Sequence, residues 1–294
     1  MRNNLRWHIM INGEKIIDLH THSSFSDGSM TPTELVYHAK NRGVDAIALT
    51  DHDTVSGIPE AKTAAIKTGV ELIDGVEISS ESVSQVHMLG LYIDVNSPAL
   101  LELFKAQQEE RIESNKKYMQ LLAEHGFPIT DEEVKAVAPH GGVGRAHYAK
   151  IMMDHGWVSS VFEAFDKYLG VGMPCYVKRM VITPEEAIDR IHSAGGLAFF
   201  AHPYQTKLTY SEIFDLARHL KNNGLDGIEG YYSEYSPEMH NTFMGMAKDL
   251  SLLVSGGSDF HAKMKPHLEI GVGRGNLQVP YSVLKKIKAA KGCN

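Results

Sequence analysis

The chain has 294 residues, of which 43% are hydrophobic and 22% are charged, close to the average of globular proteins. This much apolar material excludes a disordered chain, and the length suits one large α/β domain, alone or with a smaller insert. The 29 Lys and Arg residues against 36 Asp and Glu give a net charge of −7, which argues against a basic protein that coats duplex nucleic acid. A small, locally basic phosphate site is compatible with this charge.

The chain contains two cysteines, Cys175 and Cys293, too few for a disulfide framework. No apolar run approaches the length that spans a bilayer, and the N-terminal segment lacks the apolar core and cleavage site of a signal peptide. The sequence therefore predicts a cytoplasmic, reduced protein that neither crosses a membrane nor shows an obligate protein partner.

Short apolar runs alternate with helical patterns in the first part of the chain. The first helix is expected to begin at a Thr31 or Thr33 cap with Pro32 in its first turn, and to end at Gly43. The strands of this part are expected at 15–19, 45–49, 70–73 and 86–92, with 76–78 extending the third or forming one of its own, and the helices at 32–42 and 58–68.

The same alternation resumes in the last third of the chain. Strands are expected at 197–200, 226–229 and 252–254, and helices at 184–193, 210–223 and 237–250. A repeat of strand and helix indicates parallel strands joined by crossover helices. About seven strands suit a closed or nearly closed barrel.

The region between these parts contains no convincing strand. Residues 99–125 have the pattern of one long amphipathic helix, and shorter helices are expected at 131–137, 145–155 and 161–169. The expected buried stripe of the long helix consists of Leu100, Leu103, Phe104, Ile112, Met119 and Leu122. We therefore predict an α/β fold in which 1–97 and 179–294 form a barrel and 98–178 form a small inserted helical domain that caps the substrate site.

Histidine is unusually frequent, with 16 residues, and metal-capable side chains lie in or beside nearly every expected strand. In α/β barrels the carboxyl ends of the strands form one face, where active sites lie. Each of these residues alone has a structural explanation as a turn, cap or core residue, but their repeated placement favours one metal pocket. The set consists of His20, His22, Asp27, Asp51, His52, Asp53, Glu77, His87, His202, Asp259 and His261.

Imidazole and carboxylate ligands together suit Zn²⁺, Mn²⁺ or Fe²⁺, and the absence of cysteine from the set excludes a thiolate-rich structural zinc site. Several histidines with three or four carboxylates exceed the capacity of one ion, so two or three divalent ions are expected. Clustered ions stabilise both the attacking and the leaving oxygen of a displacement at phosphorus.

Five ordered motifs carry a resemblance to a known family. They are His20-Thr21-His22 with Asp27-Gly28, Thr50-Asp51-His52-Asp53, Gly75-Val76-Glu77, Ala201-His202-Pro203 and Gly257-Ser258-Asp259-Phe260-His261. With them the sequence resembles the PHP (polymerase and histidinol phosphatase) metal-dependent phosphoesterases, which implies a distorted (β/α)7 barrel of PHP type. The insert, with Gly144-Arg145-Ala146-His147, resembles the branch of nucleoside 3′,5′-bisphosphate phosphatases and 5′-to-3′ oligonucleotide exonucleases, although Ala146 replaces the usual proline.

The resemblance implies three metal positions. The first would be held by His20, His22, Glu77 and Asp259, the second by Glu77, His87 and His202, and the third by Asp27, His52 and His261. Asp51 and Asp53 would orient imidazoles.

The implied reaction is hydrolysis of nucleotide phosphate monoesters by a hydroxide that the metals activate. The implied substrates are nucleoside 3′,5′-bisphosphates, losing the 3′-phosphate, and short 5′-phosphorylated oligonucleotides, but not duplex nucleic acid. The catalytic set would be His20, His22, Asp27, Glu77, His202 and Asp259, with His202 and Asp27 as candidate general acids.

Recognition of a second phosphate requires positive charge outside the metal cluster. The candidates are Arg145, His147, Lys178 and Arg179, although the last two could equally form a solvated surface pair. One of Tyr231, Tyr232 and Tyr235 could stack on a base or pack at the rim.

Three alternatives stay open from the sequence. The chain could be a phosphatase for histidinol phosphate or another small molecule, an amidohydrolase-type enzyme that cleaves C–N bonds, or a non-catalytic metal-binding module.

Overall fold

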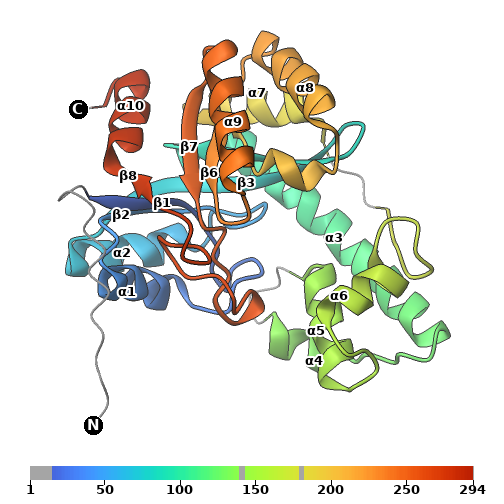
Figure 1. Ribbon diagram of the computed structural model, residues 1–294. Coiled ribbons are helices and arrows are strands. Elements are labelled where there is room, and N and C mark those ends of the chain that lie inside the picture. The colour runs from blue at the N-terminus through green and yellow to red at the C-terminus, as the bar shows by residue number, and fades with distance from the viewer. Residues whose placement is uncertain (1–14, 139–142, 179–181, 294) are drawn as a thin grey trace.

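The computed structural model describes residues 15–138, 143–178 and 182–293. One sheet lies at the centre, helices surround it, and a helical lobe built on one long helix projects to one side (Figure 1).

The sheet contains eight strands in the order β7-β6-β5-β4-β3-β2-β1-β8. Their bounds are β1 Ile16–Thr21, β2 Ala46–Leu49, β3 Glu71–Glu81, β4 Gln85–Leu91, β5 Leu197–Phe200, β6 Gly227–Tyr232, β7 Leu253–Gly257 and β8 Val279–Pro280. The predicted α/β barrel is thus confirmed, with one strand more than the expected seven, because the two-residue β8 was not foreseen.

The expectation that all strands are parallel is wrong at three pairings. β3 pairs antiparallel with β4, β4 with β5, and β1 with β8. Only residues 82–84 separate β3 from β4, and so short a connection can join only antiparallel neighbours. β3 is also continuous from Glu71 to Glu81, so 76–78 extends the third strand and forms no separate one.

The two ends of the sheet approach each other through the segment that follows β7. Thr21 bridges to Phe260 in parallel register, and the N–H of Asp259 donates to the carbonyl of His20 at 2.9 Å. Asp18, fully buried, fastens this seam because its carboxylate accepts the N–H and the hydroxyl of Ser258 and the N–H of Gly271. The barrel is therefore nearly closed beside the first of the five motifs.

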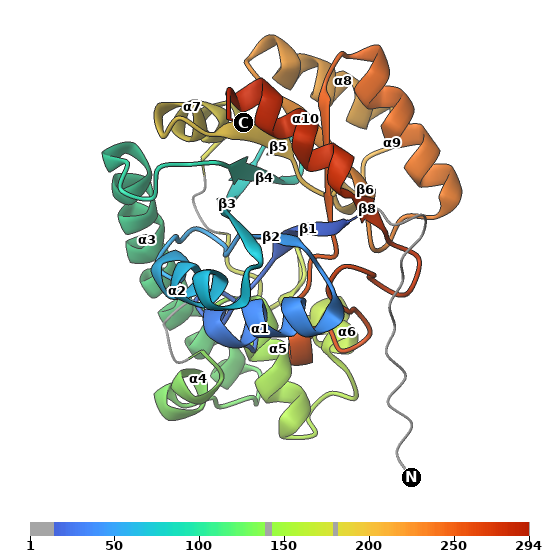
Figure 2. The ribbon, with the colours of Figure 1, turned by 90° about the vertical axis from the view of Figure 1, so that its left-hand side faces the viewer.

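Helices cover the outside of the sheet (Figure 2). They are α1 Pro32–Arg42, α2 Ile58–Thr68, α7 Pro184–Ser193, α8 Tyr210–Asn222, α9 Pro237–Asp249 and α10 Tyr281–Lys291, with short 3₁₀ turns at Pro203–Thr206 (η2) and Ala262–Met264 (η3). Thr31, Thr183 and Thr209 each form a capping box at the start of α1, α7 and α8. These caps explain why the expected helix starts agree with the structure.

The lobe consists of helices and has an apolar cluster of its own. Its elements are α3 Pro98–Glu124, α4 Asp131–Val137, α5 Arg145–Asp154, α6 Val161–Ala164 and the π-helix η1 Phe165–Leu169. None of the helices in the described ranges is long and apolar enough to cross a membrane.

The long helix α3 joins the lobe to the barrel. Leu100, Leu103 and Phe104 pack in the barrel core, whereas Tyr118 and Leu122 pack in the lobe cluster. Between them, the helical stripe passes through the polar residues Gln107, Arg111 and Ser114. The expected burial of Ile112 is therefore wrong, and that side chain is 50% exposed.

Candidate metal centre

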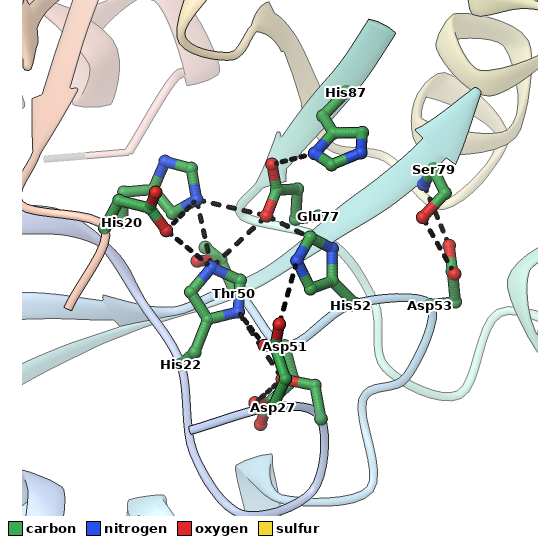
Figure 3. A network of polar contacts seen from close by, with 12 residues as sticks. His20, His22, Asp27, Thr50, Asp51, His52, Asp53, Glu77, Ser79 and His87 are labelled. Atoms are coloured by element: carbon green, nitrogen blue, oxygen red, sulfur yellow. Dashed lines mark hydrogen bonds and ion pairs between the residues drawn. The ribbon is translucent and has the colours of Figure 1, made fainter. Parts of the chain in front are cut away.

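The carboxylate of Glu77 lies at the centre of the predicted ligands (Figure 3). Glu77 is fully buried and lies within β3, in the part that 76–78 adds to the third expected strand. Oε2 lies 3.2 Å from Nε2 of both His20 and His22, and 3.3 Å from Nδ1 of His52. Oε1 lies 2.8 Å from Nδ1 of His87 and 2.7 Å from Nε2 of His202.

His20, His22 and Asp259 form one group with ligand atoms within 4.8 Å of one another. The Nε2 atoms of His20 and His22 lie 3.1 Å apart. Oδ1 of Asp259 lies 3.7 Å from Nε2 of His20 and 3.3 Å from Nε2 of His22. Metal–ligand bonds of about 2.1 Å place neighbouring ligand atoms at similar separations. The first expected metal position is therefore geometrically suited to an ion.

A second group comprises His22, Asp27, His52 and His261, which contains the third expected set. Nε2 of His261 lies 3.0 Å from Oδ1 of Asp27, and Nε2 of His52 lies 3.9 Å from Oδ2. Oδ1 of Asp27 and Nδ1 of His52 are nevertheless buried without a hydrogen bond. Oδ1 of Asp27 faces His261, and Nδ1 of His52 faces Glu77. A bound cation next to either atom would satisfy it.

The remaining expected pair, His87 and His202, shares Oε1 of Glu77 but falls into two groups. One group consists of His20, Glu77 and His202, and the other of His52, Glu77 and His87. Glu77 thus belongs to these two groups and adjoins the other two through His20, His22 and His52.

The buried imidazoles and carboxylates of this cluster shift one another's pKa values. Burial would raise the pKa of Glu77, but the imidazoles of His52, His20 and His87 hold it well below its usual value. Burial opposes a charged His22, yet hydrogen bonds to Asp259 and Glu77 outweigh this and raise its pKa to about 9. Burial lowers the pKa of His52 to about 3. Neutral and charged imidazoles therefore stand side by side around the carboxylates.

Glu229 is a buried contact of two candidate ligands that the sequence analysis missed. It is fully buried, Oε1 lies 3.1 Å from Nδ1 of His20, and Oε2 accepts the N–H of His202 at 2.7 Å. An acidic residue inside the apolar strand β6 was the available signal. A carboxylate on the far nitrogen of a ligand imidazole fixes its tautomer and orientation.

Asp51 and Asp53 act differently from the expectation that both orient imidazoles. Asp51 accepts hydrogen bonds from Ser23 and from Ser26, whose Oγ lies 3.4 Å from Nδ1 of His22. Asp53 accepts instead from Ser79 and from Arg111 of α3, at 2.7 Å from Nη2. The pair formed by Asp53 and Arg111 therefore connects the metal cluster to the lobe.

Asp259 has its two oxygens engaged on different sides. Oδ2 accepts hydrogen bonds from the Tyr232 hydroxyl at 2.7 Å and from Nζ of Lys265 at 2.6 Å, which leaves Oδ1 for the imidazoles.

Three non-glycine residues at the site, Asp53, His202 and Asp259, have positive φ angles of 53°, 26° and 55°. Such backbone conformations in non-glycine residues concentrate at functional sites and cannot be read from a sequence.

Arg145 lies in a pocket of about 390 Å³ between the β3–β4 hairpin and the lobe. Nη1 donates to the carbonyl of Leu169 and Nη2 to Oε1 of Gln85, both at 3.3 Å. Nε2 of Gln85 in turn lies 3.3 Å from Nε2 of His87. One side chain therefore separates this fixed cation from the metal cluster.

The other predicted substrate-binding residues differ in placement. His147 is buried, and its Nδ1 accepts the N–H of Gly144 at 3.1 Å, so the neutral ring carries its proton on Nε2. Lys178 is 72% exposed and pairs with Glu81 at 3.1 Å, as a surface pair would. Arg179 lies outside the described residues.

The three tyrosines after the sixth strand are not equivalent. Tyr232 and Tyr235 are buried, and their hydroxyls donate to Asp259 and to the carbonyl of Glu229. Base stacking is therefore unavailable to these two, and the ring of Tyr231 lies tilted against that of His240, with 4.8 Å between the centroids.

Comparison with known proteins agrees with this geometry. Residues 18–168 match the PHP domain. The chain belongs to the PHP-domain family. The resemblance read from the five motifs is thus confirmed, and the chain is a metal-dependent phosphoesterase of the predicted class.

Two relatives that are similar in sequence to this PHP protein have named activities. It is 39% identical to the 5′-3′ exoribonuclease of Haemophilus influenzae over 84% of this chain and 90% of that protein. It is 35% identical to the 3′,5′-nucleoside bisphosphate phosphatase of Chromobacterium violaceum over 87% of this chain and 90% of that protein.

Two solved structures share the whole fold of this PHP protein. One, from Chromobacterium violaceum, is described as an amidohydrolase with bound sulfate and no metal. It has a TM-score of 0.84 and 32% identity, with 93% of this chain and 96% of that chain covered. The other, a candidate metal-dependent phosphoesterase of Bifidobacterium adolescentis, has a TM-score of 0.84 and 29% identity, with 95% and 97% covered.

Proposed function

We propose that this PHP protein removes the 3′-phosphate of nucleoside 3′,5′-bisphosphates and trims short 5′-phosphorylated oligonucleotides. The observation that carries the proposal is the fixed guanidinium of Arg145, which lies one side chain away from the ligand cluster. A substrate with two phosphates could thus place one on the metal ions and the other on Arg145. The two relatives, an exoribonuclease and a bisphosphate phosphatase, act on substrates of this kind.

The nine predicted ligands would hold two or three ions of Mn²⁺, Fe²⁺ or Zn²⁺ around Glu77, in the three sets that the resemblance implies. Bound there, such ions lower the pKa of water and neutralise charge on phosphate oxygens. The residues suit these metals because they combine imidazole with carboxylate and include no thiolate.

The surrounding side chains keep the cluster ready for substrate. Glu229 directs Nε2 of His20 toward Glu77, and Lys265 with Tyr232 directs Oδ1 of Asp259 toward the imidazoles. His202 and Asp27 are the residues that we assign to proton donation to the leaving oxygen, if a side chain supplies that proton.

The lobe would act as the cap that selects the substrate. Arg145 is held between the rings of Phe165 and Tyr176, at 5.6 and 5.5 Å from their centroids, so its charge is positioned before the ligand arrives. Arginine suits a phosphate because its planar fork donates two parallel hydrogen bonds. His147, with its proton on Nε2, would add a neutral donor from the same helix α5.

An activity screen of the manganese-loaded protein tests the proposal. The substrates are a nucleoside 3′,5′-bisphosphate, a mononucleotide, a short 5′-phosphorylated RNA, histidinol phosphate and a cyclic amide. We expect the bisphosphate or the RNA to give the highest kcat/KM. Preference for histidinol phosphate or for the amide would overturn the substrate assignment, and metal binding without turnover of any phosphoester would indicate a non-catalytic module.

A further inference from the structure

A second pocket, of about 370 Å³, opens at His52 and shares no lining residue with the Arg145 pocket. It reaches the metal cluster because Nδ1 of His52 lies 3.3 Å from Oε2 of Glu77. The Arg145 pocket reaches the same carboxylate through Gln85 and His87, on Oε1. The ligand cluster therefore has a separate pocket next to each oxygen of Glu77.

Helix α3 runs from the barrel to the lobe (Figure 1) and lines both pockets. Leu101, Lys105 and Arg111 line the second pocket, whereas Asn115 and Tyr118, further along the helix, line the Arg145 pocket. A ligand that extends beyond the metal cluster on both sides would thus follow one helix.

The second pocket combines apolar surface with a cation. Phe25 and Leu101, the latter 47% exposed, offer an apolar wall. Lys105 is exposed and makes no ion pair with any residue that the structure describes, whereas Arg111 is already paired with Asp53. Apolar or aromatic side chains beside free positive charge suit a base and a phosphate of single-stranded nucleic acid.

The two proposed substrates differ in what they need from such a pocket. In a nucleoside 3′,5′-bisphosphate, one phosphate would lie on the metal ions and the other on Arg145, so the second pocket has nothing to bind. In an oligonucleotide, the phosphate at the metal cluster joins the 5′-terminal nucleotide to the next one. The oxygen of water bonds to its phosphorus, and the bond from phosphorus to O3′ of the terminal nucleotide breaks. That O3′ takes up a proton, and the phosphate stays on the next nucleotide, which needs a place of its own.

We propose that the second pocket binds the nucleotide that keeps the scissile phosphate when a short single-stranded oligonucleotide is cleaved, with Lys105 contacting its backbone. This inference rests on the proposed function and assigns Lys105 to substrates longer than one nucleotide. Arg111 is not the probe of choice, because its loss would leave Asp53 buried and unpaired.

The test compares two substrates with the full-length, manganese-loaded protein. One is a nucleoside 3′,5′-bisphosphate and the other is a 5′-phosphorylated tetraribonucleotide. For Lys105→Glu we expect KM of the tetranucleotide to rise at least tenfold, and for Lys105→Ala a smaller rise, with both constants for the bisphosphate unchanged. Lys117→Glu is the matched control, because Lys117 is exposed on α3 and lines neither pocket.

Other outcomes separate this inference from the proposed function. If the wild type hydrolyses neither substrate, both fail. If it hydrolyses the bisphosphate alone, the proposed trimming activity fails together with this inference, and only the phosphatase activity stands. If Lys105→Glu changes both substrates equally or neither, the proposed function stands and the second pocket is not a nucleotide site. A lower salt dependence of tetranucleotide binding in Lys105→Ala would support the assigned phosphate contact.

Discussion

Oε1 of Glu229 lies 3.1 Å from Nδ1 of His20, and both side chains are fully buried. The carboxylate holds a proton of this imidazole on Nδ1, so Nε2, which faces Glu77 and His22, is the atom that would bind a metal ion. Glu229 acts through His20 and is a positioning residue.

The change Glu229→Gln removes the charge but keeps the size of the side chain. We expect the affinity for Mn²⁺ to fall about 10- to 100-fold, as for other residues that orient metal-binding histidines. Titration calorimetry with Mn²⁺ measures this directly. Glu238→Gln, at an exposed position on α9, serves as the control, and equal affinities of the two variants would refute the role given to Glu229.

The pair of Arg111 with Asp53 connects α3 to the barrel, with side chains only 11% and 3% exposed. Arg111→Ala leaves the carboxylate of Asp53 buried without its cation, and we expect the free energy of unfolding to fall by about 3 kcal/mol. Urea denaturation provides the measurement. Arg218→Ala breaks an exposed ion pair with Asp215, and this should change the free energy of unfolding by less than about 1 kcal/mol. A similar small change for both variants would contradict the coupling.

The stability of the metal-free protein and its affinity for metal should respond to pH in opposite directions. The pKa of His22 is about 9 in the folded protein against an ordinary value of 6.5. Its contribution to stability is therefore complete below pH 6.5 and is lost as the pH rises to about 9. Metal binding needs the neutral imidazole, so affinity should rise over the same interval.

The expected result is a Tm of the metal-free protein that falls between pH 6.5 and 9, while the increase in Tm caused by Mn²⁺ grows. Thermal scans with a chelator and with Mn²⁺ at each pH measure both quantities. Asp18, whose pKa burial raises to about 6, titrates below this interval and does not interfere. A metal-induced increase that shrinks as the pH rises would contradict the protonation of His22.

Arg145→Ala removes the cation of the first pocket. We expect KM for a nucleoside 3′,5′-bisphosphate to rise about tenfold or more, since charged hydrogen bonds contribute about 1.5–3 kcal/mol. The Mn²⁺ affinity should stay unchanged, because Arg145 contacts Gln85 and Leu169 but no predicted ligand. Steady-state kinetics and metal titration together decide this, and an equal loss of both would assign Arg145 to the integrity of the metal cluster.

Local signals in the sequence were sufficient for much of the barrel. A threonine and a proline begin both α1 and α7, and a glycine ends α1. These residues lie next to the helix bounds that they determine, so the sequence pattern was enough to predict those bounds. The direction of β4 was not visible in this way, because strand direction depends on the length of a connection that the sequence pattern placed imprecisely. Ile112 shows a similar limit, since the buried stripe of α3 continues through Arg111, whose burial depends on Asp53 in a distant loop.

The candidate metal ligands could be predicted because their side chains are polar, lie in or beside the strands and occur in ordered motifs. Glu229 and Lys265 were missed because each works through a ligand from another element, His20 or Asp259, and only folding brings these pairs together. The positive φ of His202 and Asp259 is likewise a result of tertiary structure.

The central claim is that imidazoles and carboxylates hold a cluster of divalent ions around Glu77. Anomalous diffraction from crystals of the manganese-loaded protein tests it most directly. The account predicts at least two anomalous peaks next to the carboxylate of Glu77, one of them contacting His20, His22 and Asp259, and their loss in Glu77→Ala. Crystals in which ions bind only elsewhere, or in which Glu77→Ala retains every peak, would contradict it.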